Sequence, residues 1–141
     1  MSNFKTVFLD IGDTLVTNGG WVAGAREALQ ALSYSHIRLG LISNTGDWTR
    51  AELKQRLPAD FDFSIFQPEL VLLSSELQIE KPKIEIFFLA MHRSGDQPWE
   101  IVFVGESIKE SLAAQAAGIR SLRLAADYPQ DFRELPSLLG L

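Results

Sequence analysis

The sequence predicts a three-layer α/β fold, in which a parallel sheet carries helices on both of its faces. Short apolar runs alternate along the chain with longer segments whose apolar residues recur at helical spacing. Such alternation is typical of right-handed βαβ units around a parallel sheet. A length of 141 residues and a 46% hydrophobic composition suit one domain with one sizeable core. We therefore expect residues 1–141 to form a single domain.

The expected strands are short apolar runs bounded by polar or turn-forming residues. They cover residues 6–9, 37–42, 70–73, 101–104 and 121–124, of which the last is the weakest. Continuously apolar runs of this kind are typical of parallel strands that are covered on both faces. Together with the alternation, they predict a Rossmann-like sheet.

The expected helices are longer segments with start and stop signals. They cover residues 23–33, 47–57, 82–91 and 107–117, with a short helix over 131–139 near the end of the chain. Asp47 is the expected N-cap of the second helix and Pro58 its stop. Pro82 is expected in the first turn of the third helix, and Gly118 closes the fourth.

Composition and charge exclude several classes of protein. The net charge of −5 disfavours nonspecific binding to nucleic acid or to anionic membranes. With no Cys and two distant His, disulfides, thiolate chemistry and a conventional zinc site are not expected. Because the sequence shows neither a secretory signal nor an apolar run of about 20 residues, we expect a soluble cytoplasmic protein.

Chemically useful residues follow four of the expected strands. Asp10, Ser43 and Glu106 come directly after three apolar runs, and Lys81 follows a fourth at short distance. An Asp or Ser at a strand end is, on its own, most often a turn or cap residue. Because open parallel sheets bind ligands beyond the carboxyl ends of their strands, all four are expected to converge at one edge. Such a set can hold a divalent cation and a phosphoryl group.

Four segments in this order resemble the haloacid dehalogenase (HAD-like) superfamily of phosphohydrolases. They are VFLDIGDTL at 7–15, LISNT at 41–45, EKPKIEIF at 80–87 and VGESIKE at 104–110, the last followed by AAGI at 116–119. Each segment alone is a weak to moderate signal, but all four at strand ends make a strong one. The resemblance covers roughly residues 4–124 and implies a HAD-like fold.

The resemblance also implies the chemistry of a phosphatase. Asp10 is the expected nucleophile, forming an aspartyl phosphate that water later hydrolyses. The Ser43 hydroxyl and nearby main-chain N–H groups, including that of Asn44, are expected to hold the phosphoryl oxygens. Lys81 is expected to neutralise charge on the nucleophile and in the transition state.

Mg²⁺ is the cofactor that the resemblance implies. Its expected ligands are the Asp10 carboxylate, the Gly12 carbonyl and Glu106, with Glu110 acting through water. Both Glu106 and Glu110 stand where the family carries Asp. The additional methylene of Glu is expected to shift the metal or to weaken its binding.

The first segment departs from the family pattern at the acid/base position. Phosphatases of this family carry Asp two residues after the nucleophile, whereas this chain has Gly12 there and Asp13 one residue later. General acid/base help is worth about 10²–10⁴-fold, so we expect slow turnover or a long-lived phosphoenzyme. We hypothesise that Asp13 partly takes over the role; the alternative is that Asp13 only stabilises the turn.

No cap domain is expected in this chain. The family inserts caps after the first motif or between the second and third, but residues 11–42 and 44–80 are already used by the expected strands and helices. The stretch 17–20 is expected to be only a short flexible flap. An uncapped, open site admits large phosphorylated substrates or needs a partner subunit to exclude water.

The main hypothesis is thus a capless, Mg²⁺-dependent phosphomonoester phosphatase. The alternative is a binding or regulatory module that keeps the fold but not competent turnover, which Gly12 and the Glu substitutions motivate. Dehalogenase activity is a weaker possibility, because those enzymes usually carry a cap. The sequence predicts neither a particular substrate nor a particular oligomeric state.

Overall fold

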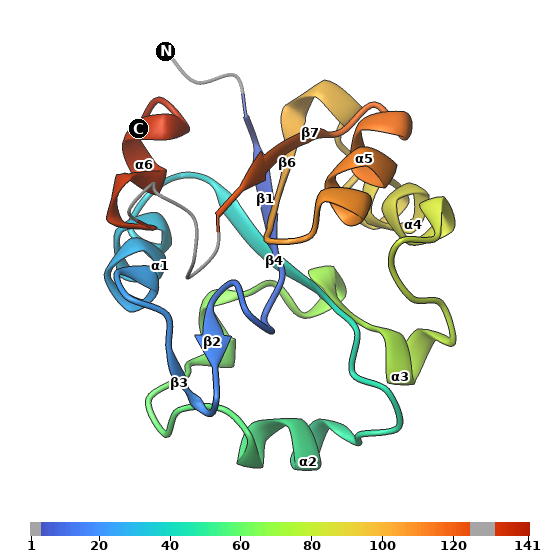
Figure 1. Ribbon diagram of the computed structural model, residues 1–141. Helices are drawn as coiled ribbons and strands as arrows, with labels where there is room; N and C mark the ends of the chain where they lie inside the picture. The colour runs from blue at the N-terminus through green and yellow to red at the C-terminus, as the bar shows by residue number, and fades with distance from the viewer. Residues whose placement is uncertain (1–3, 125–131) are drawn as a thin grey trace.

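The computed structural model describes residues 4–124 and 132–141, and these form a parallel sheet between two helical layers. Within them the sheet has five strands in the order β5-β4-β1-β6-β7, with β1 at its centre (Figure 1). The strands are β1 (Thr6–Leu9), β4 (Arg38–Ser43), β5 (Val71–Leu73), β6 (Ile101–Gly105) and β7 (Arg120–Arg123). The predicted fold class is confirmed.

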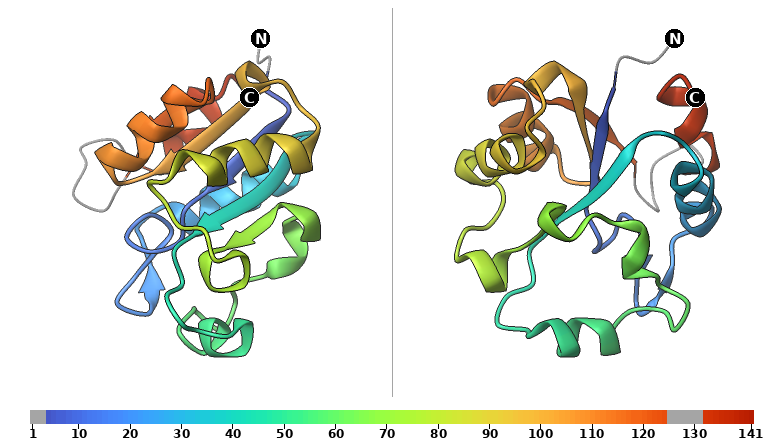
Figure 2. Two further views of the ribbon diagram at one scale, coloured as in Figure 1. Left: turned by 90° about the vertical axis from the view of Figure 1, so that its right-hand side faces the viewer. Right: turned by 180° about the vertical axis from the view of Figure 1, so that it is seen from behind.

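Helices cover both faces of this sheet. Figures 1 and 2 show α1 (Ala25–Ser33) and α6 (Leu135–Leu138) on one side, and α4 (Ile84–Ser94) and α5 (Ile108–Ala116) on the other. Alternation along β1 divides the apolar interior accordingly. Val7 and Leu9 belong to the cluster that includes α1, whereas Phe8 belongs to the cluster that includes α4 and α5.

Smaller elements lie beyond the carboxyl edge of the sheet. They are the hairpin of β2 (Val16–Thr17) and β3 (Gly20–Trp21), then α2 (Arg50–Gln55) and α3 (Ser74–Leu77) (Figure 1). Short 3₁₀ turns at Phe63–Ile65, Pro68–Leu70, Pro98–Glu100 and Phe132–Glu134 complete the described elements. Residues 11–42 and 44–80, which are described throughout, contain no inserted domain.

Three helices begin two or more residues later than expected, and the first of them is α1, which begins at Ala25 rather than at residue 23. Helix α2 begins at Arg50, and its N-cap is Thr49 rather than Asp47, because Thr49 and Glu52 form a reciprocal capping box with N–H···O distances of 3.1 Å. Helix α4 begins at Ile84 rather than in the turn that contains Pro82.

The stretch 17–20 forms the turn of the β2–β3 hairpin, with Thr17 paired to Gly20. Asn18 and Gly19 both have positive φ, 52° and 78°, as a two-residue hairpin turn requires. The start of the expected helix over 131–139 lies outside the described residues. Within the described part of the chain, no helix is long and apolar enough to cross a bilayer.

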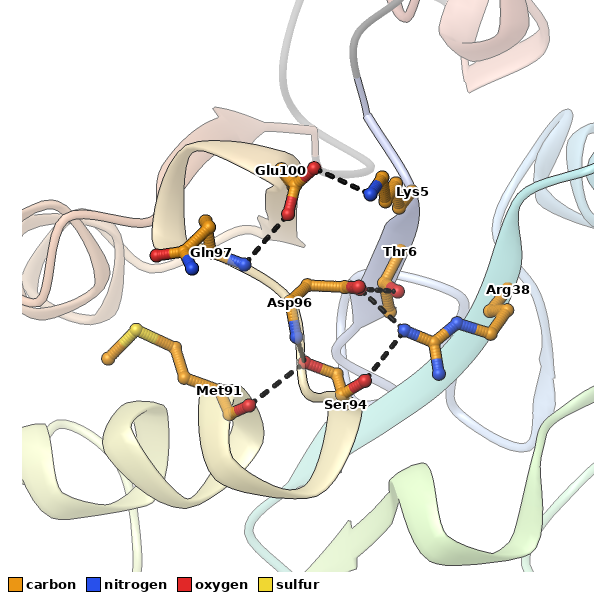
Figure 3. Close-up of polar contacts among 8 residues, drawn as sticks. All are labelled: Lys5, Thr6, Arg38, Met91, Ser94, Asp96, Gln97 and Glu100. Carbon is orange, nitrogen blue, oxygen red and sulfur yellow. Dashed lines mark hydrogen bonds and ion pairs between the residues drawn. The ribbon is translucent and has the colours of Figure 1, made fainter.

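A polar cluster ties together the amino ends of the central strands (Figure 3). The Asp96 carboxylate accepts hydrogen bonds from Thr6 Oγ1 at 2.5 Å and from Arg38 Nη2 at 2.6 Å. Arg38 also donates to the Ser94 carbonyl at 2.8 Å. These bonds link β1 and β4 to the segment after α4, and so help to fix the register that sets where the strands end at the opposite edge.

Candidate active site

The strand ends bring three of the predicted residues to one edge. Asp10 directly follows β1, Ser43 ends β4 and Glu106 directly follows β6. Strands β4 and β6 are the two parallel neighbours of β1, with Leu9 in register with Leu41 and Val104. The convergence that we expected from parallel topology is therefore present, and Asp10 stands at its centre.

Lys81 joins this group as a fully buried cation. Its Nζ lies 2.8 Å from Asp10 Oδ1 and 2.8 Å from Glu110 Oε1, and its side chain is only 1% exposed. The ammonium also lies 5.3 Å from the ring centroid of Phe103. One lysine thus neutralises part of the charge of two carboxylates that come from different elements.

The side chain of Asn44 holds the main chain of Lys81 in place. Asn44 Oδ1 accepts from the Lys81 N–H, and Asn44 Nδ2 donates to the Lys81 carbonyl, both at 2.9 Å. This reciprocal pair connects the end of β4 to the loop before α4. With its side chain engaged in this way, Asn44 retains its main-chain N–H as the group that can meet a phosphoryl oxygen.

The two oxygens of the buried Asp10 carboxylate have different partners. Oδ1 accepts from Lys81 and from the Ile11 N–H, both at 2.8 Å, whereas Oδ2 accepts a longer bond of 3.4 Å from Thr14 Oγ1. Burial raises the pKa of the Asp10 carboxyl, and Lys81 opposes that rise. The short contacts orient the carboxylate and leave lone pairs of Oδ2 available.

Glu106 is half-buried at the end of β6, in a strongly acidic neighbourhood. Partial burial raises the pKa of its carboxyl, and three nearby carboxylates raise it further: Asp10, Asp13 and Glu110. Arg123 opposes this rise, and its Nε also donates to the Glu106 carbonyl at 2.5 Å. Negative charge therefore exceeds positive charge at this edge, which favours a cation there.

The donor set suits a hydrated Mg²⁺. Within residues 4–124 and 132–141, no three His, Cys, Asp or Glu side chains stand together as a complete ligand set. Two carboxylates, Asp10 and Glu106, nevertheless follow neighbouring strands, and the carbonyl of Gly12 lies two residues after Asp10. Mg²⁺ keeps several waters and is usually held by one or two carboxylates together with substrate phosphate, so this composition fits.

Gly12 and Asp13 occupy the turn after β1. Both residues are exposed, and a Cβ built on Gly12 would meet no heavy atom within 4 Å. Asp13 has a positive φ of 58°, and its Oδ1 accepts a hydrogen bond of 3.0 Å from Thr17 in the hairpin. This contact favours the turn-stabilising interpretation of Asp13, while its charge is close enough to affect Glu106.

Some functional contacts were not predicted from the sequence. Thr14 lies inside the first motif and is fully buried against Asp10, so its place in the motif was the available signal. The Phe103 ring near Lys81 carried no signal beyond that of a core residue. Trp48 lines the cavity next to Ser43, whereas Trp21 turns away to donate to Asp60 Oδ1 at 2.8 Å.

Curated relatives of this chain are phosphatases of greater length. Over 102 residues, 72% of this chain, it is 33% identical to a phosphoglycolate phosphatase of Salmonella choleraesuis (strain SC-B67). It is 31% identical over 102 residues to the phosphoglycolate phosphatase of Escherichia coli (strain K12). In both cases the matched stretch spans 38% of the relative's length.

Solved structures share the fold at low sequence identity. An uncharacterized protein from Listeria monocytogenes serotype 4b has a TM-score of 0.79 at 21% identity, with 96% of this chain and 97% of that chain covered. YfnB from Bacillus subtilis, a HAD-hydrolase structure bound to magnesium, has a TM-score of 0.72 at 18% identity, with 87% and 57% covered. At these identities the likeness shows the fold alone.

A family model also matches most of this chain. The model of haloacid dehalogenase-like hydrolases covers residues 11–124, which include the ends of β4 and β6 and the buried lysine. With the strand order and the residues at the strand ends already described, this match identifies the family. The chain belongs to the haloacid dehalogenase-like hydrolases.

Proposed function

We propose that this chain is a Mg²⁺-dependent phosphomonoester phosphatase that acts through an aspartyl phosphate on Asp10. One observation carries the proposal: a buried carboxylate ends the central strand and is oriented by a buried lysine at 2.8 Å. The relatives that are named phosphoglycolate phosphatases support the reaction class. Since the chain spans only part of those relatives, their substrate is a candidate and not an assignment.

The first step is nucleophilic attack on phosphorus. An oxygen of Asp10 forms the new P–O bond, the bond from phosphorus to the ester oxygen breaks, and the leaving alkoxide takes up a proton. In the second step water attacks phosphorus, inorganic phosphate leaves, and the Asp10 carboxylate is restored. Lys81 Nζ, already in contact with Asp10, offsets negative charge on the carboxylate and on the transferred group.

Ser43 and Asn44 provide the other side of the phosphoryl site. Ser43 is 4% exposed and lines the same cavity as Gly12, directly beside the strand that ends at Asp10. We propose that its hydroxyl and the main-chain N–H of Asn44 donate to phosphoryl oxygens. The Asn44 side chain acts differently, because it positions Lys81.

The residues that would hold Mg²⁺ are Asp10, Glu106 and the carbonyl of Gly12, with Glu110 reaching it through water. When bound, the ion screens the repulsion between the nucleophilic carboxylate and the anionic phosphate. The excess of carboxylates around Glu106 supports such a cation. Glu110 meanwhile keeps one oxygen on Lys81.

Turnover is expected to be slow because Gly12 provides no acid or base. The leaving group must then take its proton from solvent, or in part from Asp13. Slow turnover is compatible with a second function, that of a binding or regulatory module, and Gly12 is the observation that favours it. A long-lived phosphoenzyme would suit either role.

Release of inorganic phosphate tests the proposal. Wild-type protein and the Asp10→Asn variant are compared on a panel of phosphomonoesters that includes phosphoglycolate, with Mg²⁺ and with EDTA. We expect the wild type to release phosphate with Mg²⁺ but not with EDTA. The variant should release none above background under either condition. Equal release by both proteins would contradict the role of Asp10. Binding of phosphate with no turnover of any ester would support the module instead.

A further inference from the structure

A cavity of about 530 Å³ opens from the phosphoryl site into the space between the β2–β3 hairpin and α2. Gly12 and Ser43 are among the residues that line it, so it includes the place where the phosphate is proposed to lie. Most of its wall is apolar and comes from two segments of the chain: Ile11, Val16, Trp48, Leu53 and Leu57. Ligand cavities typically have volumes of about 300–1,000 Å³ and largely apolar walls, and this one has both properties.

The segment that carries α2 is fastened at both of its ends. Near its start, Arg50 makes a two-point ion pair with Glu76 of α3, at 2.7 and 3.1 Å. After its end, Asp60 accepts from Trp21 Nε1 at 2.8 Å and pairs with Arg26 at 2.9 Å. These contacts connect the α2 segment to α3 at one end and to Trp21 and Arg26 at the other.

Charge in this cavity is confined to one side chain. Among the described residues that line it, Arg56 alone is charged. Its guanidinium stacks on the Trp48 ring, 4.2 Å from the ring centroid, and Nη1 donates to the Glu52 carbonyl at 3.3 Å. The remaining guanidinium donors are well suited to a carboxylate, which arginine binds in a two-point geometry.

We propose that this cavity is the leaving-group subsite and that it selects aryl phosphomonoesters. Their ring carries a carboxylate on the side away from the phosphate. This rests on the proposed function, because the phosphoryl site orients the ester toward the cavity. The ring packs against Trp48 and Leu53, and the carboxylate pairs with Arg56. Selectivity for the leaving group is thereby provided by the hairpin, which follows the first motif, and by the α2 segment, which follows the second.

Binding of phosphonates tests the subsite without requiring turnover. Calorimetry with Mg²⁺ compares three probes: methylphosphonate, phenylphosphonate and 4-carboxyphenylphosphonate. We expect each step along this series to tighten binding, by about 10-fold for the ring and about 10-fold for the carboxylate. Three equal affinities would overturn the proposal.

Variants assign the two increments to residues. Arg56→Gln is expected to remove the gain from the carboxylate, measured as the ratio between the affinities for 4-carboxyphenylphosphonate and phenylphosphonate. Trp48→Ala is expected to reduce the gain from the ring, with its melting temperature checked in parallel. Lys54→Gln is the matched control, because Lys54 lies in α2 two residues before Arg56 but does not line the cavity, and it should change neither gain.

Acetyl phosphate separates failure of the subsite from failure of the proposed function. If Asp10 is phosphorylated by acetyl phosphate but the phosphonates bind equally, the subsite is wrong and the phosphatase proposal remains. If no phosphonate binds, the subsite is likewise wrong. The phosphatase proposal then remains if acetyl phosphate phosphorylates Asp10 and fails if it does not. Loss of carboxylate selectivity in Lys54→Gln as well would also contradict the role of Arg56.

Discussion

At the scale of single residues, the candidate site has more carboxylates than cations, and this imbalance affects the stability of the free protein. Lys81 is shared between Asp10 and Glu110, and Glu106 adds a third carboxylate close by. Burial makes each unpaired charge costly, since desolvation of an ion inside a protein amounts to several kcal/mol. The excess of carboxylates over cations at this edge therefore lowers the stability of the free protein.

Removing the charge of Asp10 should stabilise the free protein. Burial raises the pKa of Asp10 above its ordinary value of 3.8, so the folded state binds the proton more tightly than the unfolded chain does. Stability is then lost as the pH rises from 3.8 through the raised pKa. We expect Asp10→Asn to raise the melting temperature in EDTA, and more so at pH 7 than at pH 4. A lower melting temperature of the variant at pH 7 would refute this account.

An aspartate at position 12 should accelerate dephosphorylation. Gly12 does not adopt a positive φ, and a Cβ there has open space, so Gly12→Asp fits without strain. The new carboxyl would stand two residues after the nucleophile, where it can give and take the proton. We expect an increase of about 10²–10⁴-fold in phosphate release, measured in single turnovers.

The matched control for this variant is Gly12→Asn, which has the same shape and cannot transfer the proton. It should turn over as slowly as the wild type. Equal rates for Gly12→Asp and Gly12→Asn would show that the missing acid does not limit the reaction.

At the scale of elements, the two edges of the sheet have different tasks. The carboxyl ends of the strands hold the candidate active site, and the amino ends hold the cluster of Asp96, Thr6 and Arg38 (Figure 3). The Asp96 side chain is 9% exposed and makes short, charge-assisted bonds, so its contribution is to stability.

Loss of the Asp96 charge should therefore weaken the fold without disabling the site. We expect Asp96→Asn to lower the free energy of unfolding by about 1.5–3 kcal/mol, the usual worth of hydrogen bonds to charged groups. Urea unfolding measures this change, and phosphorylation of Asp10 by acetyl phosphate should persist in the folded variant. A variant of unchanged stability would contradict the role of this cluster.

The sequence predicts the elements whose apolar pattern is set by burial. It does not predict those whose position is set by local hydrogen bonds and turns. Val7 and Phe8 lie in a strand covered on both faces, so their apolar run was sufficient to locate β1. The hairpin has strands of only two residues each, too short to show alternation, although Asn18-Gly19 is a strong turn signal. The start of α2 depends on a capping box between Thr49 and Glu52, whereas Asp47 is an equally acceptable N-cap by residue type alone.

Site prediction was limited in a similar way. Parallel topology alone places Asp10, Ser43 and Glu106 at one edge, so their convergence followed from the element order. The bonds between Asn44 and the main chain of Lys81 depend on two loops that meet only in the folded chain. Pattern and spacing contain no information on such a contact, and the cavity that α2 closes was unpredictable for the same reason.

At the scale of the whole molecule, part of the negative charge is concentrated at one edge of the sheet. The net charge of −5 includes carboxylates gathered at one edge, and Arg56 stands in the adjacent cavity. Because the two apolar clusters share one sheet, we propose that the described residues act as a single domain. We propose that the hairpin and α2 provide the shelter that an inserted domain would give.

The central claim is that Asp10 becomes covalently phosphorylated. Intact-mass measurement of acid-quenched protein, after incubation with acetyl phosphate and Mg²⁺, tests it without knowledge of the substrate. We predict the gain of one phosphoryl group in the wild type and none in Asp10→Asn. An unmodified wild type, or the same gain in Asp10→Asn, would contradict the account.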